Sequence, residues 1–197
     1  MGLPWGLAGA ALGALATVVL LRLLGQPGGE RREAFEAGSA PGSGLPALDI
    51  SQMSPEERAT RLFNRVMRLD EEGKGDSVQF FLPMALQTYA QLPALDLDAR
   101  YHIGVLELAG GDAGGAMAQA DTIRGAAATH LFAFILRARA LELRNDARGA
   151  RQAYADFLRH ERQERSRQRP EYADHAQNLD AFHAQATRVT GAGGASP

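Results

Sequence analysis

The chain has 197 residues, of which 45% are hydrophobic and 22% are charged, so it is long enough for one folded domain and an appendage. Its 21 basic and 23 acidic residues give a net charge of −2, without the basic excess that is typical of nucleic-acid-binding proteins. There is no cysteine, which excludes disulfides, thiolate metal sites and cysteine nucleophiles. We therefore expect no nucleic-acid partner.

The amino-terminal segment has the composition of a membrane span. Leu3 to Leu21 is an uncharged run of 19 residues, which as a helix is about 29 Å long and matches a hydrocarbon core of roughly 30 Å. Arg22 and Trp5 lie near its two ends, where interfacial side chains are favoured. The pattern predicts a transmembrane anchor helix over residues 1–24. A cleaved signal peptide is the alternative, but the run is longer than usual and no basic residue precedes it.

The flanking residues bear on orientation and self-association. Gly9 and Gly13 belong to a stripe of small residues at four-residue spacing, which predicts weak self-association of the anchor. Basic residues follow the span and none precedes it, so the positive-inside rule favours a cytoplasmic C-terminal domain, and the short amino-terminal tail leaves the opposite orientation open. Only one of the basic residues is lysine, a bias typical of GC-rich bacterial genomes, so the expected location is a bacterial inner membrane.

Two segments are predicted to lack regular structure. Between Gly25 and Pro46 there are six glycines and three prolines with little apolar periodicity, which predicts a flexible linker over residues 25–53. Residues 191–197 are expected to form a disordered tail.

The rest of the chain, residues 54–190, has helical periodicity and no strand-like alternation. Ser54-Pro55-Glu56-Glu57 is a capping box with proline at the first helical position. Pro83 is expected to kink or interrupt the second helix. The predicted helices are 54–73, 76–92, 97–109, 113–124, 129–144, 147–166 and 171–190. Their short connections predict antiparallel helix hairpins.

The hairpins repeat at a period that indicates a known family. The turns Gly111-Asp112 and Asn145-Asp146 lie 34 residues apart, the period of the tetratricopeptide repeat (TPR), and Gly75-Asp76 lies 36 residues earlier. Small and apolar residues occupy motif positions in the two clear repeats: Ile103-Gly104, Ala116, Ala120, Phe134, Ala138, Leu141, Ala150 and Tyr154. Over residues 54–190 the chain therefore resembles the TPR family. The resemblance implies an all-α fold in which antiparallel helix hairpins stack as a short TPR-like solenoid.

The resemblance also implies a peptide-binding groove lined by the first helix of each hairpin. Projecting that stripe onto this sequence selects eight groove residues, with Leu62 and Glu142 beside them: Arg65, Leu69, Tyr101, Val105, Leu108, Phe132, Ile135 and Arg139. In this groove the arginines would hold a partner's carboxylates. The alternative is that the C-terminal helix folds back and buries the stripe as core.

Three other segments have residues that occur in binding or metal sites, but a structural explanation fits each of them better. The glycine-rich stretch 110–115 lacks the strand and the Lys-Ser or Lys-Thr of a phosphate loop, which favours a hairpin turn. The five arginines of segment 159–169 could meet anionic lipid or nucleic acid, but the absence of aromatic residues favours a solvated helix end. His175 and His183 are eight residues apart, not a ligand spacing on a helix, so we expect surface histidines of a capping helix.

The functional expectation is a membrane-anchored, non-catalytic protein–protein interaction scaffold, which binds a peptide or a helix of a protein that is itself membrane-associated. No cofactor, metal or catalytic residue is predicted. One alternative is an envelope assembly factor, because the order of anchor, linker and repeats is similar to that of cytochrome c biogenesis TPR proteins. A remote alternative is a hydrolase or transferase that uses His175 and His183 with nearby acids.

Overall fold

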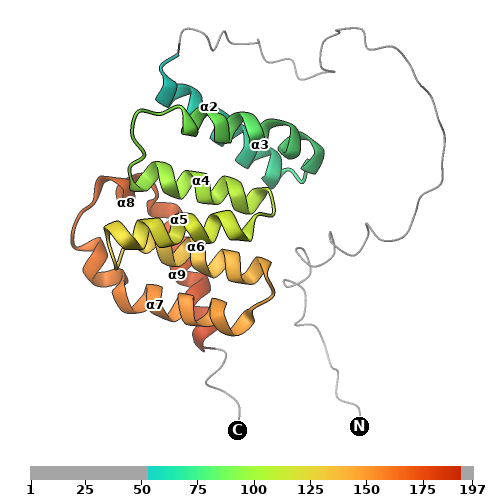
Figure 1. Cartoon of the computed structure of the whole chain (residues 1–197). Helices are drawn as coiled ribbons and strands as arrows, with labels where there is room; N and C mark the ends of the chain where they lie inside the picture. Colours follow the sequence, from blue (N-terminus) through green and yellow to red (C-terminus); the bar gives the residue numbers. More distant parts are fainter. Residues whose placement is uncertain (1–52, 192–197) are drawn as a thin grey trace, which may run out of the picture. The chain divides into compact units, whose positions relative to one another are not determined.

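The computed structural model describes residues 53–191, and this part of the chain is all-α, without a strand (Figure 1). Its helices are α2 (Pro55–Glu71), α3 (Gly75–Ala90), α4 (Leu97–Ala109), α5 (Ala113–Ala126), α6 (Leu131–Leu143), α7 (Ala147–Arg165), α8 (Pro170–Asp174) and α9 (Ala176–Gly191). Consecutive helices from α2 to α7 pack against each other. The predicted anchor, linker and tail lie outside the described residues, among which no helix combines the length and hydrophobicity that a membrane span requires.

Most helix boundaries follow the predictions, with two differences. Pro83 lies inside α3 without interrupting it, because buried residues on both sides of the proline, Val78 and Tyr89, hold the helix in the core. The segment predicted as one helix over 171–190 is divided into α8 and α9. The division lies at His175, whose side chain contacts Asp98 on α4.

Three hairpin turns share one backbone motif. Each contains a residue with positive φ, namely Gly73 (68°), Gly111 (83°) and Asn145 (58°). In each, the next residue donates its N–H to the carbonyl five residues earlier, over 2.8–2.9 Å: Lys74 to Leu69, Asp112 to Glu107 and Asp146 to Leu141. This is the Schellman ending, which satisfies carbonyls that a helix end leaves free. The equivalent turn of the first hairpin is therefore Gly73-Lys74, and the predicted match to Gly75-Asp76 is out of register by two residues.

The turn at Gly111 explains the glycine-rich stretch that follows it. The Asp112 carboxylate accepts hydrogen bonds from the backbone N–H groups of Gly114 and Gly115, each 2.9 Å long, and so caps α5. A Cβ atom on Gly115 would lie 2.7 Å from the Asp112 carboxylate. The glycines therefore make room for an aspartate cap, as the hairpin-turn interpretation predicts.

Close contact between neighbouring hairpins depends on one glycine. A Cβ atom on Gly104 of α4 would lie 2.6 Å from a methyl group of Leu136 on α6, and Leu136 is fully buried. Because a side chain at position 104 would collide with this core residue, glycine allows α4 and α6 to approach closely.

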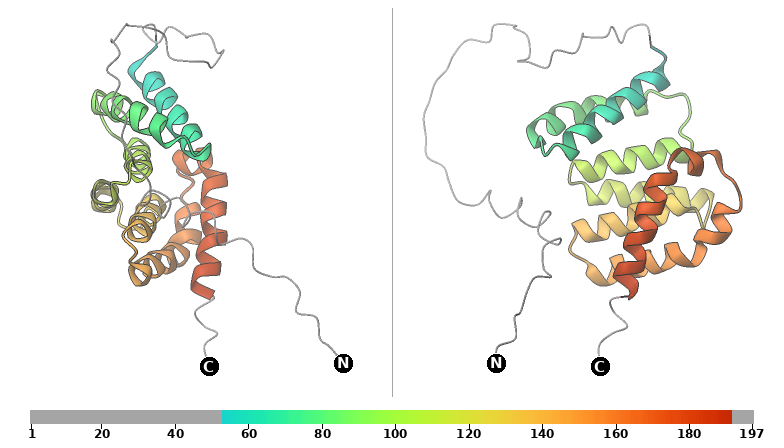
Figure 2. Two further views of the ribbon diagram at one scale, coloured as in Figure 1. Left: turned by 90° about the vertical axis from the view of Figure 1, so that its right-hand side faces the viewer. Right: turned by 180° about the vertical axis from the view of Figure 1, so that it is seen from behind.

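The last helix does not continue the stack. Figure 2 shows α9 running across the other helices, on one side of them, instead of lying parallel to α7. Its buried residues Leu179, Phe182 and Ala186 belong to the same core cluster as Tyr101 of α4 and Phe132 of α6. We call the surface of α4 and α6 that carries Tyr101, Val105, Phe132 and Ile135 the inner face.

Candidate functional site

The inner face is partly occupied by the C-terminal segment of the chain itself. Tyr101, Phe132 and Ile135 are at most 6% exposed. The rings of Tyr101 and Phe132 stack at 4.1 Å, and the imidazole of His175 lies edge-on to both at 5.2 Å. The prediction that these three residues line an open groove is therefore wrong. The C-terminal segment packs against this face, since His175 contacts Tyr101 and Phe132, and the segment's apolar residues belong to the same buried cluster as all three positions.

Arg139 also contacts α9. Its guanidinium donates a hydrogen bond to Gln185 of α9 over 2.7 Å and to Glu142 over 3.0 Å, and lies 5.5 Å from the ring centre of Phe182. The Tyr154 hydroxyl donates to Glu142 over 2.7 Å, and burial together with this carboxylate raises the pKa of the tyrosine. The groups that Arg139 binds in the structure thus belong to this chain, whereas the prediction was a carboxylate of a partner.

The two predicted residues on α2 do not lie on the inner face. The Arg65 guanidinium packs over the ring of Phe81 on α3, 4.0 Å from its centre, and Leu69 lies on the same side of α2, one turn further on. Phe63 of α2 does contact α4, since its ring lies 4.2 Å from that of His102. The prediction that Arg65 and Leu69 line the groove is therefore wrong, because their side of α2 faces α3.

Val105 and Leu108 keep some exposure although both also pack against the core, and we call these two inner-face residues the open half. Both are half-buried. The C-terminal segment contacts α4 near its amino end, through His175 and Asp98, and α9 then makes its polar contacts with Arg139 of α6 and with α7. The carboxyl half of α4 lies away from this path.

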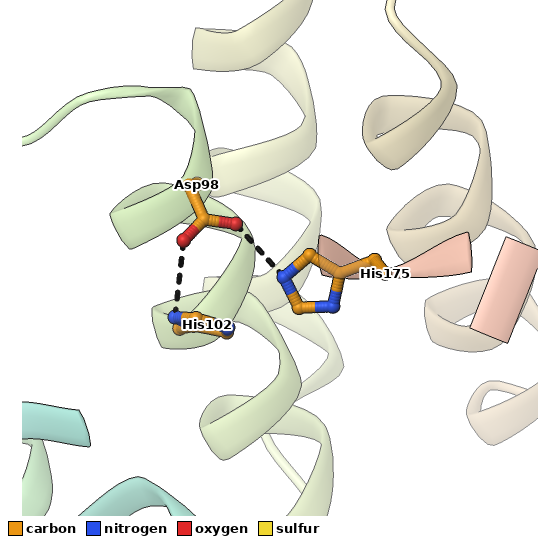
Figure 3. A group of neighbouring side chains, drawn as sticks. All are labelled: Asp98, His102 and His175. Carbon is orange, nitrogen blue, oxygen red and sulfur yellow. Dashed lines mark hydrogen bonds and ion pairs between the residues drawn. The ribbon is translucent and has the colours of Figure 1, made fainter. Parts of the chain in front are cut away.

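A cluster of three ionisable side chains lies where the C-terminal segment meets α4 (Figure 3). Nε2 of His175 is 2.9 Å from one carboxylate oxygen of Asp98, and Nδ1 of His102 is 3.7 Å from the other. The histidine side chains are only 12% and 14% exposed, and Asp98 is 34% exposed. One ligand atom from each residue lies within 4.8 Å of the other two. This arrangement could hold a metal ion.

Burial and hydrogen bonding set the charges in this cluster. Burial lowers the pKa of His102, and the nearby Asp98 only partly offsets it, so the imidazole favours its neutral form. Burial acts to raise the pKa of Asp98, but the hydrogen bond from His175 and the neighbouring imidazoles outweigh it and hold that pKa below its usual value. The cluster is thus a carboxylate beside a neutral imidazole.

The cluster was not predicted from the sequence, although the spacing of two of its three residues indicates that they lie together. Asp98 and His102 are four residues apart on one helix and so lie on the same face. His175 is 77 residues beyond Asp98, and only the folding-back of the C-terminal segment brings it there. The prediction of a surface position for His175 is therefore wrong. His183 is 52% exposed and is paired with Glu161 on α7 instead.

The arginine-rich segment is largely paired within the chain. Of its five arginines, four have a carboxylate partner within 4.0 Å: Arg159 with Asp156, Arg165 with Glu161 and Asp180, and Arg167 and Arg169 with Glu164. The contacts of Arg165 with Asp180, and of Arg167 and Arg169 with Glu164, tie the end of α7 to the segment that follows.

No protein-family model, curated protein or solved structure gives a significant match to this chain.

Proposed function

We propose that this protein is a membrane-anchored scaffold without catalytic activity, which binds a helix or an extended segment of a partner protein on the open half of its inner face. The observation that carries the proposal is that the inner face already binds a segment of this chain, the one that contains α8 and α9. Tyr101 and Phe132 pack against His175, and Arg139 donates a hydrogen bond to Gln185 of α9. A surface with these properties has the chemistry that helix recognition requires.

The scaffold is proposed to be a short TPR-like solenoid. In support, the two helices of each of three hairpins are joined by the same left-handed turn, and the turns at Gly111 and Asn145 are 34 residues apart. Gly104 provides the close approach between the first helices of two neighbouring hairpins. Such solenoids use the face lined by these helices for binding, which is the face that carries Val105 and Leu108.

The proposed anchor would hold the binding face close to the membrane. It rests on the uncharged run from Leu3 to Leu21. A linker of 29 residues, 25–53, has an end-to-end distance of about 30 Å as a coil. An anchored binding domain of this reach meets a partner in the same membrane at a raised effective concentration, so a modest interface suffices.

The proposal is tested by placing a charge in the open half. Val105→Glu and Leu108→Glu each bring a carboxylate into an apolar contact surface, and Thr122→Glu makes the matched change on the exposed side of α5. Each tagged full-length chain is expressed in its own membranes, solubilised and purified, and the co-purifying proteins are compared by quantitative mass spectrometry.

We expect one partner to be lost from both open-half variants, by tenfold or more, and retained by Thr122→Glu. Circular dichroism must show that helicity is unchanged in all three chains. Equal recovery of every co-purifying protein by the three variants would contradict the proposal.

A further inference from the structure

We propose that Asp98, His102 and His175 form a binding site for a divalent transition-metal ion, with Zn²⁺ as the best-matched cation. The proposal is independent of the scaffold function. It rests on the convergence of two imidazoles on one carboxylate, from two parts of the chain that are far apart in sequence (Figure 3).

The spacing of the ligands suits a metal ion. Zinc binds imidazole nitrogen and carboxylate oxygen at about 2.0–2.2 Å, so its ligand atoms lie about 3.3 Å from one another in a tetrahedral site. The two separations measured from the Asp98 oxygens, 2.9 Å to His175 and 3.7 Å to His102, lie on either side of this value. These two separations involve different oxygens of Asp98. With one ligand atom from each residue, all three atoms lie within 4.8 Å of one another, so the side chains must rotate toward a common centre when an ion binds.

The local structure holds the ligands in place before any ion binds. Asp98 and His102 lie one turn apart on α4, so the helix fixes their relative position. His175 follows the last residue of α8, and its ring packs against those of Tyr101 and Phe132. The ring of His102 packs on Phe63 of α2. Preorganised ligands lose little conformational entropy on binding.

A purely structural role explains only part of the cluster. The hydrogen bond between Asp98 and His175 fastens the C-terminal segment to α4, and it accounts for those two residues. His102 is 14% exposed, and its Nδ1 lies 3.7 Å from the Asp98 carboxylate, beyond hydrogen-bond length. Its nitrogens are not among the buried polar atoms of residues 53–191 that lack a partner, so solvent reaches them, and a metal ion between the three side chains would replace that water.

The choice of cation follows from the donor set. Imidazole nitrogens favour Zn²⁺ and its neighbours over Mg²⁺ and Ca²⁺, which prefer oxygen ligands throughout. Three protein ligands leave a fourth position for water, and Asp98, at 34% exposed, opens the cluster to solvent on its side. Bound metal would link α4 to the junction of α8 and α9 and thereby strengthen the docking of α9.

The test measures zinc bound to the purified full chain. The protein is treated with EDTA, freed of the chelator and titrated with ZnCl₂ against a chromophoric competitor, and the melting temperature is recorded with and without zinc. The variants are His102→Gln, His175→Gln and Asp98→Asn, which removes the charge but keeps the shape. His183→Gln is the matched control, since it removes a histidine that lies outside the cluster.

We expect one zinc ion per wild-type chain and a raised melting temperature on zinc addition. Each cluster variant should bind at least tenfold more weakly, and His183→Gln should bind as the wild type does. If circular dichroism shows that His175→Gln does not fold, the zinc affinities of His102→Gln and Asp98→Asn test the proposal. Absence of zinc binding by the wild type, or binding that survives all the cluster substitutions, would overturn the proposal.

Discussion

Truncation of Phe182 offers a direct probe of how α9 is held. Its side chain is 3% exposed, and its ring lies 4.8 Å from that of Tyr154 and 4.7 Å from that of Phe157. Replacing a buried phenylalanine with alanine costs about 3–5 kcal/mol, because the transfer free energy is lost and a cavity remains. At 1.4 kcal/mol for each factor of ten, this corresponds to a loss of about 10² to 4 × 10³ in the docking equilibrium.

The expected result is local. Because α9 is the last helix and contacts mainly α7, Phe182→Ala should free α9 before the rest of the stack unfolds. Amide hydrogen exchange, followed by mass spectrometry, should accelerate at least a hundredfold in α9 and in the part of α6 that Arg139 joins to it, with little change in α2 and α3. Phe80→Ala is the control, since Phe80 is 68% exposed and its loss should cost less than about 1 kcal/mol.

The reasoning is refuted if exchange in α9 rises less than tenfold in Phe182→Ala. It is equally refuted if α2 and α3 accelerate as much as α9, because the helix would then be an inseparable part of one cooperative unit.

Three further predictions concern stability. Gly104→Ala should destabilise the protein by about 1–3 kcal/mol in urea unfolding because its methyl group collides with Leu136, whereas Gly125→Ala, with open space around it, should not destabilise it. Asn145→Ala should cost about 1 kcal/mol and Asn145→Gly nothing, since φ is 58° at this turn; equal stability of the two variants would contradict the turn geometry. Burial lowers the pKa of His130, so the unfolded state binds more protons below about pH 6.5 and stability falls as the pH decreases from 7.5 to 5.5. His130→Asn should weaken that dependence in thermal melts, and an unchanged slope would exclude His130 as its source.

Local signals predicted the helices well. The capping box at Ser54, the bounds of α4 and the turns at Gly111 and Asn145 each follow from residues within a few positions of one another. Local chemistry decides where a helix begins and ends, so a sequence contains that information without reference to the rest of the fold.

The candidate site was harder to predict because it depends on contacts between distant segments. Which side of α2 meets α4 is decided by packing: Arg65 lies against Phe81 of α3 and Phe63 against His102 of α4. Helical periodicity locates the apolar stripe of α2 but does not say which of its two edges faces α4. The burial of Phe132 and the meeting of His175 with Asp98 both depend on the path of the chain after α7. The residues of the short turn before Pro170 do not indicate in which direction the chain continues after α7.

The most direct test of the account is site-specific photo-cross-linking in the native membrane. A photoreactive phenylalanine analogue is placed at Val105 in one full-length chain and at Thr122 in another, and the membranes are irradiated and analysed for adducts. The account predicts one adduct of discrete mass from position 105 and none of that mass from position 122. The same adduct from both positions, or none from position 105, would contradict the claim that the open half of the inner face binds a partner.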